Sequence, residues 1–327
     1  MRVILAESDK TTLRHLAQRL SDLRGIAVTD LCGDLTQTFN AVEHRPPQLV
    51  ILSASLVARP EFEMMDLLFR TLGVAWLAFR AKGQSTHAGG IGADRLLDPD
   101  QPDDAILARL HRAVGAGTQP PPRASAGLLR SVGHEGESRL ILIGSSTGGI
   151  DALLAILDMF PADCPPTLIV QHTGASYSAG LARLLDRNAA PEVREAGDGD
   201  VPTPGRVLLA PGADHHLVLA PRAPHACTLQ SGARISGHRP SVDALFHSAL
   251  PMANRVTAAL LTGMGRDGAE GLLALRRAGA RTIAQDRETS VVYGMPGYAV
   301  QIGAAERELP LSAIGSALLN ARQKVKA

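Results

Sequence analysis

The stretch RLILIGSSTGGI, residues 139–150, decides how the larger part of this chain folds. Its first half, 139–143, is a nearly unbroken aliphatic run that predicts a buried strand, and a turn rich in glycine and serine follows at once. The apolar segment 150–159 then has the spacing of a helix. A strand, a tight turn and a helix in direct succession form the repeating unit of parallel, doubly wound sheets.

The same alternation continues from this stretch to the C-terminus. We expect strands at 139–143, 167–171, 206–210, 216–220, 258–262 and 281–285, and helices at 150–159, 177–189, 241–253 and 268–278. A short segment that contains Pro211-Gly212 separates strands 206–210 and 216–220, which predicts that these two form an antiparallel hairpin within the otherwise parallel sheet.

The first 115 residues alternate in the same way but form a separate block. Strands are expected at 3–6, 49–52, 74–78 and 94–97, and leucines at helical spacing predict a helix between the first strand and Gly25. Residues 116–137 contain three consecutive prolines and lack periodicity, which is typical of a linker. We therefore predict an α/β protein with two doubly wound domains, 1–115 and 138–327, joined by the linker 116–137.

Composition excludes several classes of function. Lys and Arg number 33 against 32 Asp and Glu, and aromatic residues make up 3%, so neither a basic surface nor a base-stacking surface for nucleic acid is expected. No apolar run reaches the roughly 20 residues that span a bilayer, and acidic residues near the N-terminus argue against a signal peptide. Three scattered cysteines predict a reduced, cytoplasmic protein without a cysteine metal site.

The strongest candidate for chemistry is Ser146 in the motif Gly144-Ser145-Ser146-Thr147-Gly148. The pattern G-x-S-x-G between a strand and a helix allows a sharp turn that exposes the serine hydroxyl next to helix N-terminal amides. The alternative is a glycine loop that cradles phosphate. That reading needs G-x-G-x-x-G or a Gly-Lys-Ser/Thr ending, and neither is present.

A nucleophilic serine needs a general base, and His172 has the best position for one. It directly follows strand 167–171, and functional groups of doubly wound sheets gather at the carboxyl ends of strands. His215 and His216, on the predicted hairpin, are the main rivals.

Asp267 is the candidate for the carboxylate that orients the histidine. It follows strand 258–262 in a loop with three glycines. The competing interpretation is that Asp267 caps the helix that begins at Gly268. The chain order Ser, His, Asp differs from the Ser, Asp, His order of α/β-hydrolases, so a standard member of that fold is disfavoured.

These residues belong to a longer series of motifs that resembles one known family, the chemotaxis response regulator protein-glutamate methylesterase (CheB). The motifs cover nearly all of residues 138–327, in the order of the family. They are the stretch 143–149, the pair Gln171-His172, the stretch 210–212 with His215, and the stretches 238–243, 262–268 and 294–296.

The resemblance implies that Ser146, His172 and Asp267 form the catalytic triad, with backbone amides near Thr147 or Met264 stabilising the oxyanion. It implies hydrolysis of glutamate γ-methyl esters on methyl-accepting chemotaxis receptors, deamidation of some glutamines by the same route, and no metal or organic cofactor. The departures in this part are small. Ile150 replaces a frequent proline, and Thr173-Gly174 replaces Met-Pro beside the expected base.

The N-terminal block resembles the family's receiver domain in pattern but lacks its reactive residues. A receiver needs paired acids to hold magnesium, an aspartate that accepts phosphoryl, and then a hydroxyl residue and a lysine on later strands. At these places the chain has Glu7 and Ser8 with Asp9 one residue late, then Ser53, then Leu77-Ala78-Phe79, and finally Asp98-Pro99. Serine replaces neither a carboxylate nucleophile nor a metal-binding acid, so we expect a receiver-like fold without phosphorylation.

Two alternatives remain open at this point. The chain could dock on receptors or on a chemosensory histidine kinase as a scaffold without activity, although the complete Ser, His and Asp set argues against this. It could also be a general esterase for small molecules.

Overall fold

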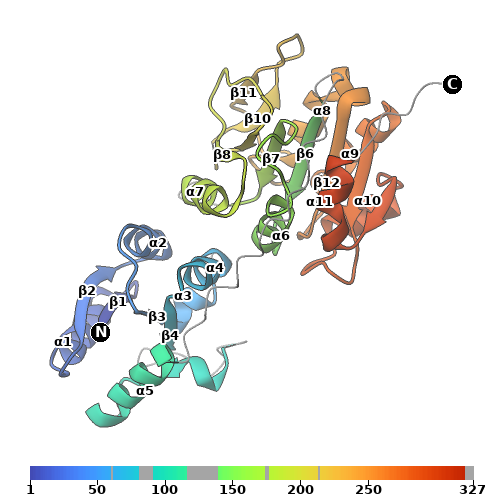
Figure 1. The fold of residues 1–327 in the computed structure, drawn as a ribbon. Helices are drawn as coiled ribbons and strands as arrows, with labels where there is room; N and C mark the ends of the chain where they lie inside the picture. The colour runs from blue at the N-terminus through green and yellow to red at the C-terminus, as the bar shows by residue number, and fades with distance from the viewer. Residues whose placement is uncertain (60–61, 81–90, 116–138, 174–176, 213, 321–327) are drawn as a thin grey trace. The chain divides into compact units, whose positions relative to one another are not determined.

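The computed structural model describes residues 1–327 except 60–61, 81–90, 116–138, 174–176, 213 and 321–327 (Figure 1). The chain divides into two compact units, Met1–Ala124 and Ser125–Ala327, each with its own hydrophobic core. The predicted linker 116–137 lies outside the described residues. No helix among the described residues is long and apolar enough to cross a bilayer.

The N-terminal unit is a five-stranded parallel sheet in the order β2-β1-β3-β4-β5, the strand order of flavodoxin-like and receiver folds. Its strands are β1 (Arg2–Ala6), β2 (Ala27–Cys32), β3 (Leu49–Ser53), β4 (Ala75–Phe79) and β5 (Leu96–Leu97). Its helices are α1 (Lys10–Ser21), α2 (Leu35–His44), α3 (Ala54–Val57), α4 (Phe62–Leu72), the short 3-10 helix η1 (Ala93–Arg95) and α5 (Asp103–Gly115). Strand β2, which is polar on its exposed side, was not predicted from the sequence.

Asp9 lies one residue after the position where a receiver domain has the second of its paired acids, and the first helix of this unit gives Asp9 a different role. The Asp9 carboxylate accepts a hydrogen bond from the Thr12 backbone N–H at 2.7 Å and so caps the N-terminus of α1. Leu13, Leu16 and Leu20 on the same helix are buried against the sheet. The position of Asp9 is therefore the position of a helix cap.

The C-terminal unit is a seven-stranded sheet in the order β14-β13-β12-β6-β7-β9-β8, with every neighbouring pair parallel. The strands are β6 (Leu140–Ser145), β7 (Thr167–Gln171), β8 (Glu192–Glu195), β9 (Arg206–Leu209), β12 (Val256–Leu260), β13 (Arg281–Gln285) and β14 (Arg307–Leu309). The helices are α6 (Gly149–Leu157), α7 (Ser178–Asn188), α8 (Val242–Ser248), η2 (Leu250–Arg255), α9 (Ala269–Arg277), α10 (Met295–Gln301) and α11 (Leu311–Leu319).

Helices cover the large sheet on both faces. Apolar side chains of α8, α9 and α10 pack in one buried cluster with the side chains of one face of β6 and β12, whereas α6 contacts α11, which also packs on β12 and β13. All five residues of β7 and of β12 are buried, as expected for central strands of a parallel sheet covered on both faces.

The predicted hairpin of strands 206–210 and 216–220 is wrong. The structure places β9 between β7 and β8, parallel to both, so it is a member of the large sheet. The antiparallel pair is formed instead by β10 (His216–Leu219) and β11 (Cys227–Gln230), which make a separate two-stranded sheet. Both predicted strands exist, but their apolar pattern does not specify their partners.

The order of the large sheet puts β6 between β7 and β12. The chain therefore leaves β6 toward β7 on one side and returns to β12 on the other, which is the point where doubly wound sheets open a crevice at their carboxyl ends. Ser146 directly follows β6 and His172 directly follows β7, and Asp267 lies in the loop after β12, so the segments that follow three neighbouring strands carry the three predicted site residues.

Candidate active site

Ser146 lies in the turn between β6 and α6 and is half-buried. Its backbone N–H donates to the Thr262 carbonyl at 3.0 Å, and its carbonyl accepts from the Gly149 N–H at 2.8 Å. Gly148 adopts a left-handed φ of 76°, and a Cβ there would lie 2.5 Å from the Cβ of Val291. The sharp turn therefore needs glycine both for its backbone conformation and for the close approach of the 291 loop.

Ser145 and Gln171 join the Ser146 turn to the next strand end. The buried Ser145 hydroxyl donates to Gln171 Oε1 at 2.6 Å, and Gln171 Nε2 donates to the carbonyls of Ser146 and His172 at 2.9 and 3.1 Å. The His172 N–H donates in turn to the Ser145 carbonyl at 3.0 Å. These bonds fix the backbone of Ser146 relative to that of His172.

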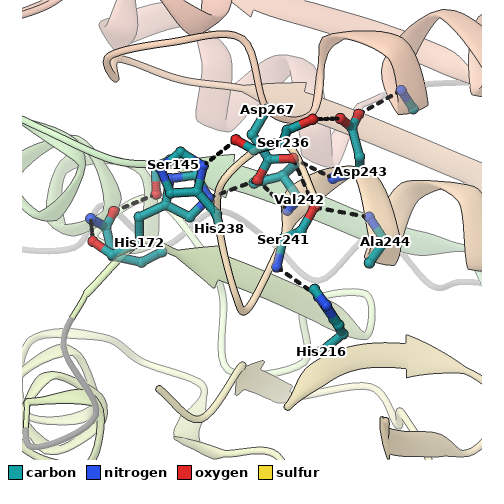
Figure 2. Close-up of polar contacts among 12 residues, drawn as sticks. Ser145, His172, His216, Ser236, His238, Ser241, Val242, Asp243, Ala244 and Asp267 are labelled. Carbon is teal, nitrogen blue, oxygen red and sulfur yellow. Dashed lines mark hydrogen bonds and ion pairs between the residues drawn. The ribbon is translucent and has the colours of Figure 1, made fainter. Parts of the chain in front are cut away.

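His172 and Asp267 are hydrogen-bonded to each other, with His172 Nε2 and Asp267 Oδ2 2.8 Å apart (Figure 2). Asp267 is fully buried and the His172 side chain is 8% exposed. Because a carboxylate only accepts, the proton of this bond lies on Nε2, and Nδ1 carries the free lone pair of the neutral ring. Nδ1 is buried and, among the described residues, has no hydrogen-bond partner.

Asp267 also sits at the N-terminus of α8, where it accepts three further hydrogen bonds. They come from the Ser241 hydroxyl at 2.8 Å and from the backbone N–H groups of Val242 and Asp243 at 2.8 and 3.1 Å. Burial by itself would raise the pKa of Asp267, but the hydrogen bonds from His172, Val242 and Ser241 outweigh it and hold the pKa below the ordinary 3.8. The carboxylate is therefore ionised when it contacts the imidazole.

The alternative role for Asp267, as the cap of the next helix, is contradicted by these contacts. Helix α9 begins after Gly268, which serves as its N-cap without any side-chain hydrogen bond. Asp267 instead contacts the first turn of α8, an element that precedes it in the sequence by more than 20 residues. The carboxylate thus joins α8 to His172.

His238 is stacked on His172, and the sequence reasoning did not select it for the site. The two rings are parallel within 1° with centroids 3.8 Å apart. His238 Nδ1 donates to the Ser236 carbonyl at 3.0 Å, and the Ser236 hydroxyl donates to Asp243 at 3.0 Å (Figure 2). Burial, and secondarily the neighbouring His172, lower the pKa of His238 below 6.5. A neutral ring therefore covers one face of the candidate base.

His172, His238 and Asp267 also form a cluster of possible metal ligands, with donor atoms within 4.8 Å of one another. The stacking argues against such a site. The lone pairs of two parallel rings lie in planes separated by the stacking distance, so both cannot point at one ion at the roughly 2.0 Å of a zinc–nitrogen bond. We assign these three residues to the hydrogen-bonded network.

Within the described residues, neither rival histidine makes a hydrogen bond to His172 or Asp267, and His216 reaches this network only through Ser241. His216 is buried in β10, where Nδ1 accepts from the Ser241 N–H at 3.2 Å and Nε2 donates to the Ala233 carbonyl at 2.9 Å. Both of its nitrogens therefore hold the loop that leads into α8. His215 is half-buried just before β10.

Of the predicted oxyanion donors, Thr147 follows Ser146 directly in the chain, and Met264 follows Gly263, which lies against Ser146. A Cβ on Gly263 would lie 2.6 Å from the Ser146 Cβ, so the loop after β12 packs directly against the serine. The Thr262 hydroxyl donates to the Thr147 carbonyl at 2.9 Å and ties the two loops together. In the part of the chain that the structure describes, no protein acceptor bonds the backbone N–H of Thr147 or of Met264.

Several residues of the site carry no local signal of their own. Ser145, Ser241 and His238 act through partners far away in the sequence, and only the motif 238–243 drew attention to the segment that contains two of them. Of the segment Thr173-Gly174, where the sequence departs from the resembled family, Thr173 is half-buried and Gly174 lies outside the described residues.

Comparisons with known proteins find one matching family model, curated relatives along nearly the whole chain and a similar solved structure. The model of the CheB methylesterase family matches residues 141–318. A protein of Agrobacterium fabrum named protein-glutamate methylesterase/protein-glutamine glutaminase is 36% identical over 97% of this chain and 95% of its own length. A Caulobacter vibrioides protein of the same name, number 1, is 36% identical over 97% of both chains. The crystal structure of the Thermotoga maritima CheB methylesterase catalytic domain is 36% identical, with a TM-score of 0.54, and covers 56% of this chain and 98% of its own.

Proposed function

The chain belongs to the CheB methylesterase family, and on that premise we propose that Ser146, His172 and Asp267 hydrolyse the γ-methyl esters of glutamate residues on chemoreceptors. Membership of the family makes the chain a hydrolase, and its curated relatives along nearly the whole length are methylesterases and glutaminases by name. The assignment of roles to individual residues is our proposal, and it rests on the geometry of the site.

The first half of the reaction forms an acyl-enzyme. Ser146 Oγ attacks the ester carbonyl carbon while His172 Nδ1 takes the hydroxyl proton. The C–OCH₃ bond then breaks, and the same proton passes from Nδ1 to the leaving methoxide, so that methanol departs. His172 Nδ1 is the ring nitrogen that Asp267 leaves available, which supports its role as the base.

The second half repeats these steps with water. Nδ1 removes a proton from water, the hydroxide attacks the acyl carbon, and Ser146 regains its proton as the glutamate carboxylate leaves. The imidazolium that forms twice in each cycle lies 2.8 Å from the buried Asp267 carboxylate, and the neutral His238 ring lies against its face. In this role the carboxylate stabilises the charge that develops on the ring during proton transfer, and the His238 ring helps to fix the orientation of the imidazole.

The tetrahedral oxyanion needs donors that are fixed before the reaction. The backbone N–H groups of Thr147 and Met264 fit this role, because each adjoins a residue of the contact between Ser146 and Gly263, their two loops are tied together, and they use no other protein acceptor among the described residues. The side chains of Met264 and Val291 are 71% and 68% exposed, and they give the approach to Ser146 an apolar border suited to aliphatic stems on a receptor helix.

The same groups account for a glutaminase activity. An amide carbonyl accepts the same attack by Ser146, and the proton on His172 then goes to the departing nitrogen, so that ammonia leaves in place of methanol. Amides have poorer leaving groups than esters, so we expect deamidation to be the slower reaction.

We propose that the N-terminal unit is a receiver-like domain that does not undergo phosphorylation. At the acceptor position, Ser53 is fully buried and its hydroxyl shares a hydrogen bond with Ser55 at 3.0 Å. Glu7 is the acid nearest the expected metal position, and its Oε1 accepts the Asp9 N–H at 3.0 Å, an interaction within its own loop. Neither contact provides a carboxylate nucleophile.

We also propose that the enzyme works in the cytoplasm on methyl-accepting receptors, with a chemosensory histidine kinase as a second partner. The three cysteines are free, buried thiols, which fits a reducing compartment. Burial raises the pKa of Cys32 and Cys164 to about 11 each, so these thiols are unreactive.

The observation that carries the proposal is the hydrogen bond between His172 and Asp267. These two residues follow β7 and β12, the strands on either side of β6, which leads into Ser146. The test is methanol release from receptor membranes carrying methyl-labelled glutamate, with p-nitrophenyl acetate as a second substrate. We expect methanol release by the full chain and none by Ser146→Ala. Turnover of the nitrophenyl ester alone would indicate a general esterase, and no turnover of either would indicate a scaffold.

A further inference from the structure

The N-terminal unit contains a cavity of about 300 Å³ that is lined by residues of α4, β4, η1 and α5 and by Val74. It exists because β5 is short. Strand β5 pairs only with Ala78 and Phe79, so the first three residues of β4 have no strand partner on this side within the described structure. The edge of the sheet therefore opens into a pocket with Trp76 in its wall.

Positive charge dominates the lining of this cavity. Its charged side chains are Arg70, Arg95, Arg109, Arg112, Asp66 and Asp94. The Asp66 carboxylate is already engaged, because Oδ1 accepts the Trp76 indole N–H at 2.8 Å and Oδ2 accepts Arg70 Nε at 3.1 Å. The pocket thus presents more guanidinium charge than its own carboxylates neutralise.

Arg109 is the residue that most directly indicates an anion site. Its Nε donates to the Leu96 carbonyl at 3.1 Å, which fixes the guanidinium plane on the cavity wall. Its Nη2 is buried and, among the described residues, has no hydrogen-bond partner. Leaving a charged donor buried without an acceptor costs more free energy than leaving a neutral one, so an acceptor from outside the protein would be strongly favoured here.

The aromatic side chains of the pocket restrict what that ligand is. The aromatic rings that line the pocket are those of Trp76 and Phe69. The Arg95 guanidinium lies over the Trp76 ring, 4.6 Å from its centroid, Phe62 makes a T-shaped contact with the same ring at 4.9 Å, and Phe69 is fully buried. Because Arg95 covers the Trp76 ring and Phe69 is buried, the pocket is poorly suited to stacking a nucleobase. The planar forks of several arginines match the oxygen geometry of phosphate, and the volume exceeds that of inorganic phosphate alone.

We propose that this cavity binds a small, non-aromatic phosphorylated metabolite, held by Arg109 with Arg95 and Arg112. The site lies wholly within the N-terminal unit and is independent of the methylesterase reaction. It would give a domain that lacks a phosphoacceptor a way to sense phosphate-bearing molecules without a covalent bond.

The test uses the full chain and its own reporter, because Trp76 is the one tryptophan in the sequence. Glycerol 3-phosphate and inorganic pyrophosphate serve as probes, and tryptophan fluorescence and titration calorimetry record binding at physiological ionic strength. We expect saturable binding with one site per chain, and at least about tenfold weaker binding by Arg109→Gln and Arg112→Gln. Arg24→Gln, which changes an exposed arginine of the same unit away from the cavity, is the matched control and should bind like wild type.

Arg112 is exposed, so its replacement keeps the proposal testable if Arg109→Gln unfolds, as judged by circular dichroism. The proposal is overturned if neither method detects binding at millimolar probe. It is equally overturned if Arg112→Gln binds like wild type, or if Arg24→Gln weakens binding as much as Arg112→Gln, because the interaction would then be with general surface charge.

Discussion

The two units of this chain are both parallel α/β sheets, yet their central strands end on residues of very different chemical capacity. In the C-terminal unit, the strand ends bring together a half-buried serine, a histidine with a free lone pair and a carboxylate that accepts four hydrogen bonds. In the N-terminal unit, the corresponding ends carry Glu7, with one carboxylate oxygen buried and unpaired among the described residues, and Ser53, bonded to another hydroxyl.

This difference shows that sheet topology determines which positions lie close together but does not determine their chemistry. Parallel sheets gather their strand ends at one edge whatever those residues are, and the chemistry follows from residue types and hydrogen-bond partners. The comparison predicts that substitutions at the strand ends of the C-terminal unit remove activity, whereas the ends in the N-terminal unit accept no phosphoryl group.

The largest effect is expected for Ser146→Ala, which removes the nucleophile. Comparable triads lose on the order of 10⁶ in kcat when the serine is replaced. Ser145→Ala is the comparison variant: it removes a neighbouring hydroxyl that positions the site through Gln171 but is not the nucleophile, so we expect a far smaller loss. Methanol release measures both, and substantial activity in Ser146→Ala would contradict the assignment.

His172→Ala should be nearly as damaging, because the proton then has no acceptor beside Ser146. His215→Ala is the control histidine, and we expect a rate within a few-fold of wild type. Initial rates of methanol release on the same receptor membranes compare the two. Should His215→Ala be inactive and His172→Ala active, the base is His215.

Asp267→Asn should lower kcat by on the order of 10⁴, because an amide cannot hold the imidazole in the same tautomer or stabilise its charge. It should also lower the free energy of unfolding by about 1–3 kcal/mol. The new NH₂ group is a donor, so it cannot accept the hydrogen bonds that one carboxylate oxygen now receives from Ser241, Val242 or Asp243.

The matched control for this change is Asp243→Asn. Asp243 is buried beside Asp267 but bonds Ser236 and the Gly271 N–H, with no contact to His172. Thermal unfolding and methanol release together separate the effects. A similar loss of activity in both variants would assign Asp267 a structural role only.

The sequence predicts much of this site because each triad residue directly follows, or closely follows, an apolar strand. Strands 167–171 and 281–285 are found at the predicted residues, and β6 and β12 are shifted by one or two. The long-range partners were beyond prediction. Nothing local indicates that Asp267 would contact α8 instead of capping α9, or that β9 would pair with the polar strand β8, which lacks an apolar signal.

A smaller effect concerns pH and the stacked histidines. The pKa of His238 is lowered in the folded protein. Below the ordinary histidine pKa of 6.5, the His238 side chain therefore binds a proton more readily in the unfolded chain than in the folded one. The stability that His238 contributes is therefore complete above about pH 6.5 and is lost as pH falls through the folded pKa.

His238→Phe keeps a flat ring over His172 but removes this titration. We expect its melting temperature to fall less steeply than that of wild type between about pH 7 and 5, by about 2–4 °C at most. Scanning calorimetry across this range measures the difference. Parallel curves for the two proteins would show that protonation of His238 is not linked to folding.

The measurement that tests the contrast between the two units most directly follows phosphoryl transfer and methanol release in the same sample. Full-length protein is mixed with magnesium, methylated receptor membranes and a radiolabelled, phosphorylated chemosensory kinase freed of nucleotide. We predict steady methanol release that is equal with and without the phosphorylated kinase, absent in Ser146→Ala, and no label on the chain. Stable label within residues 1–115, accompanied by faster methanol release, would contradict the account.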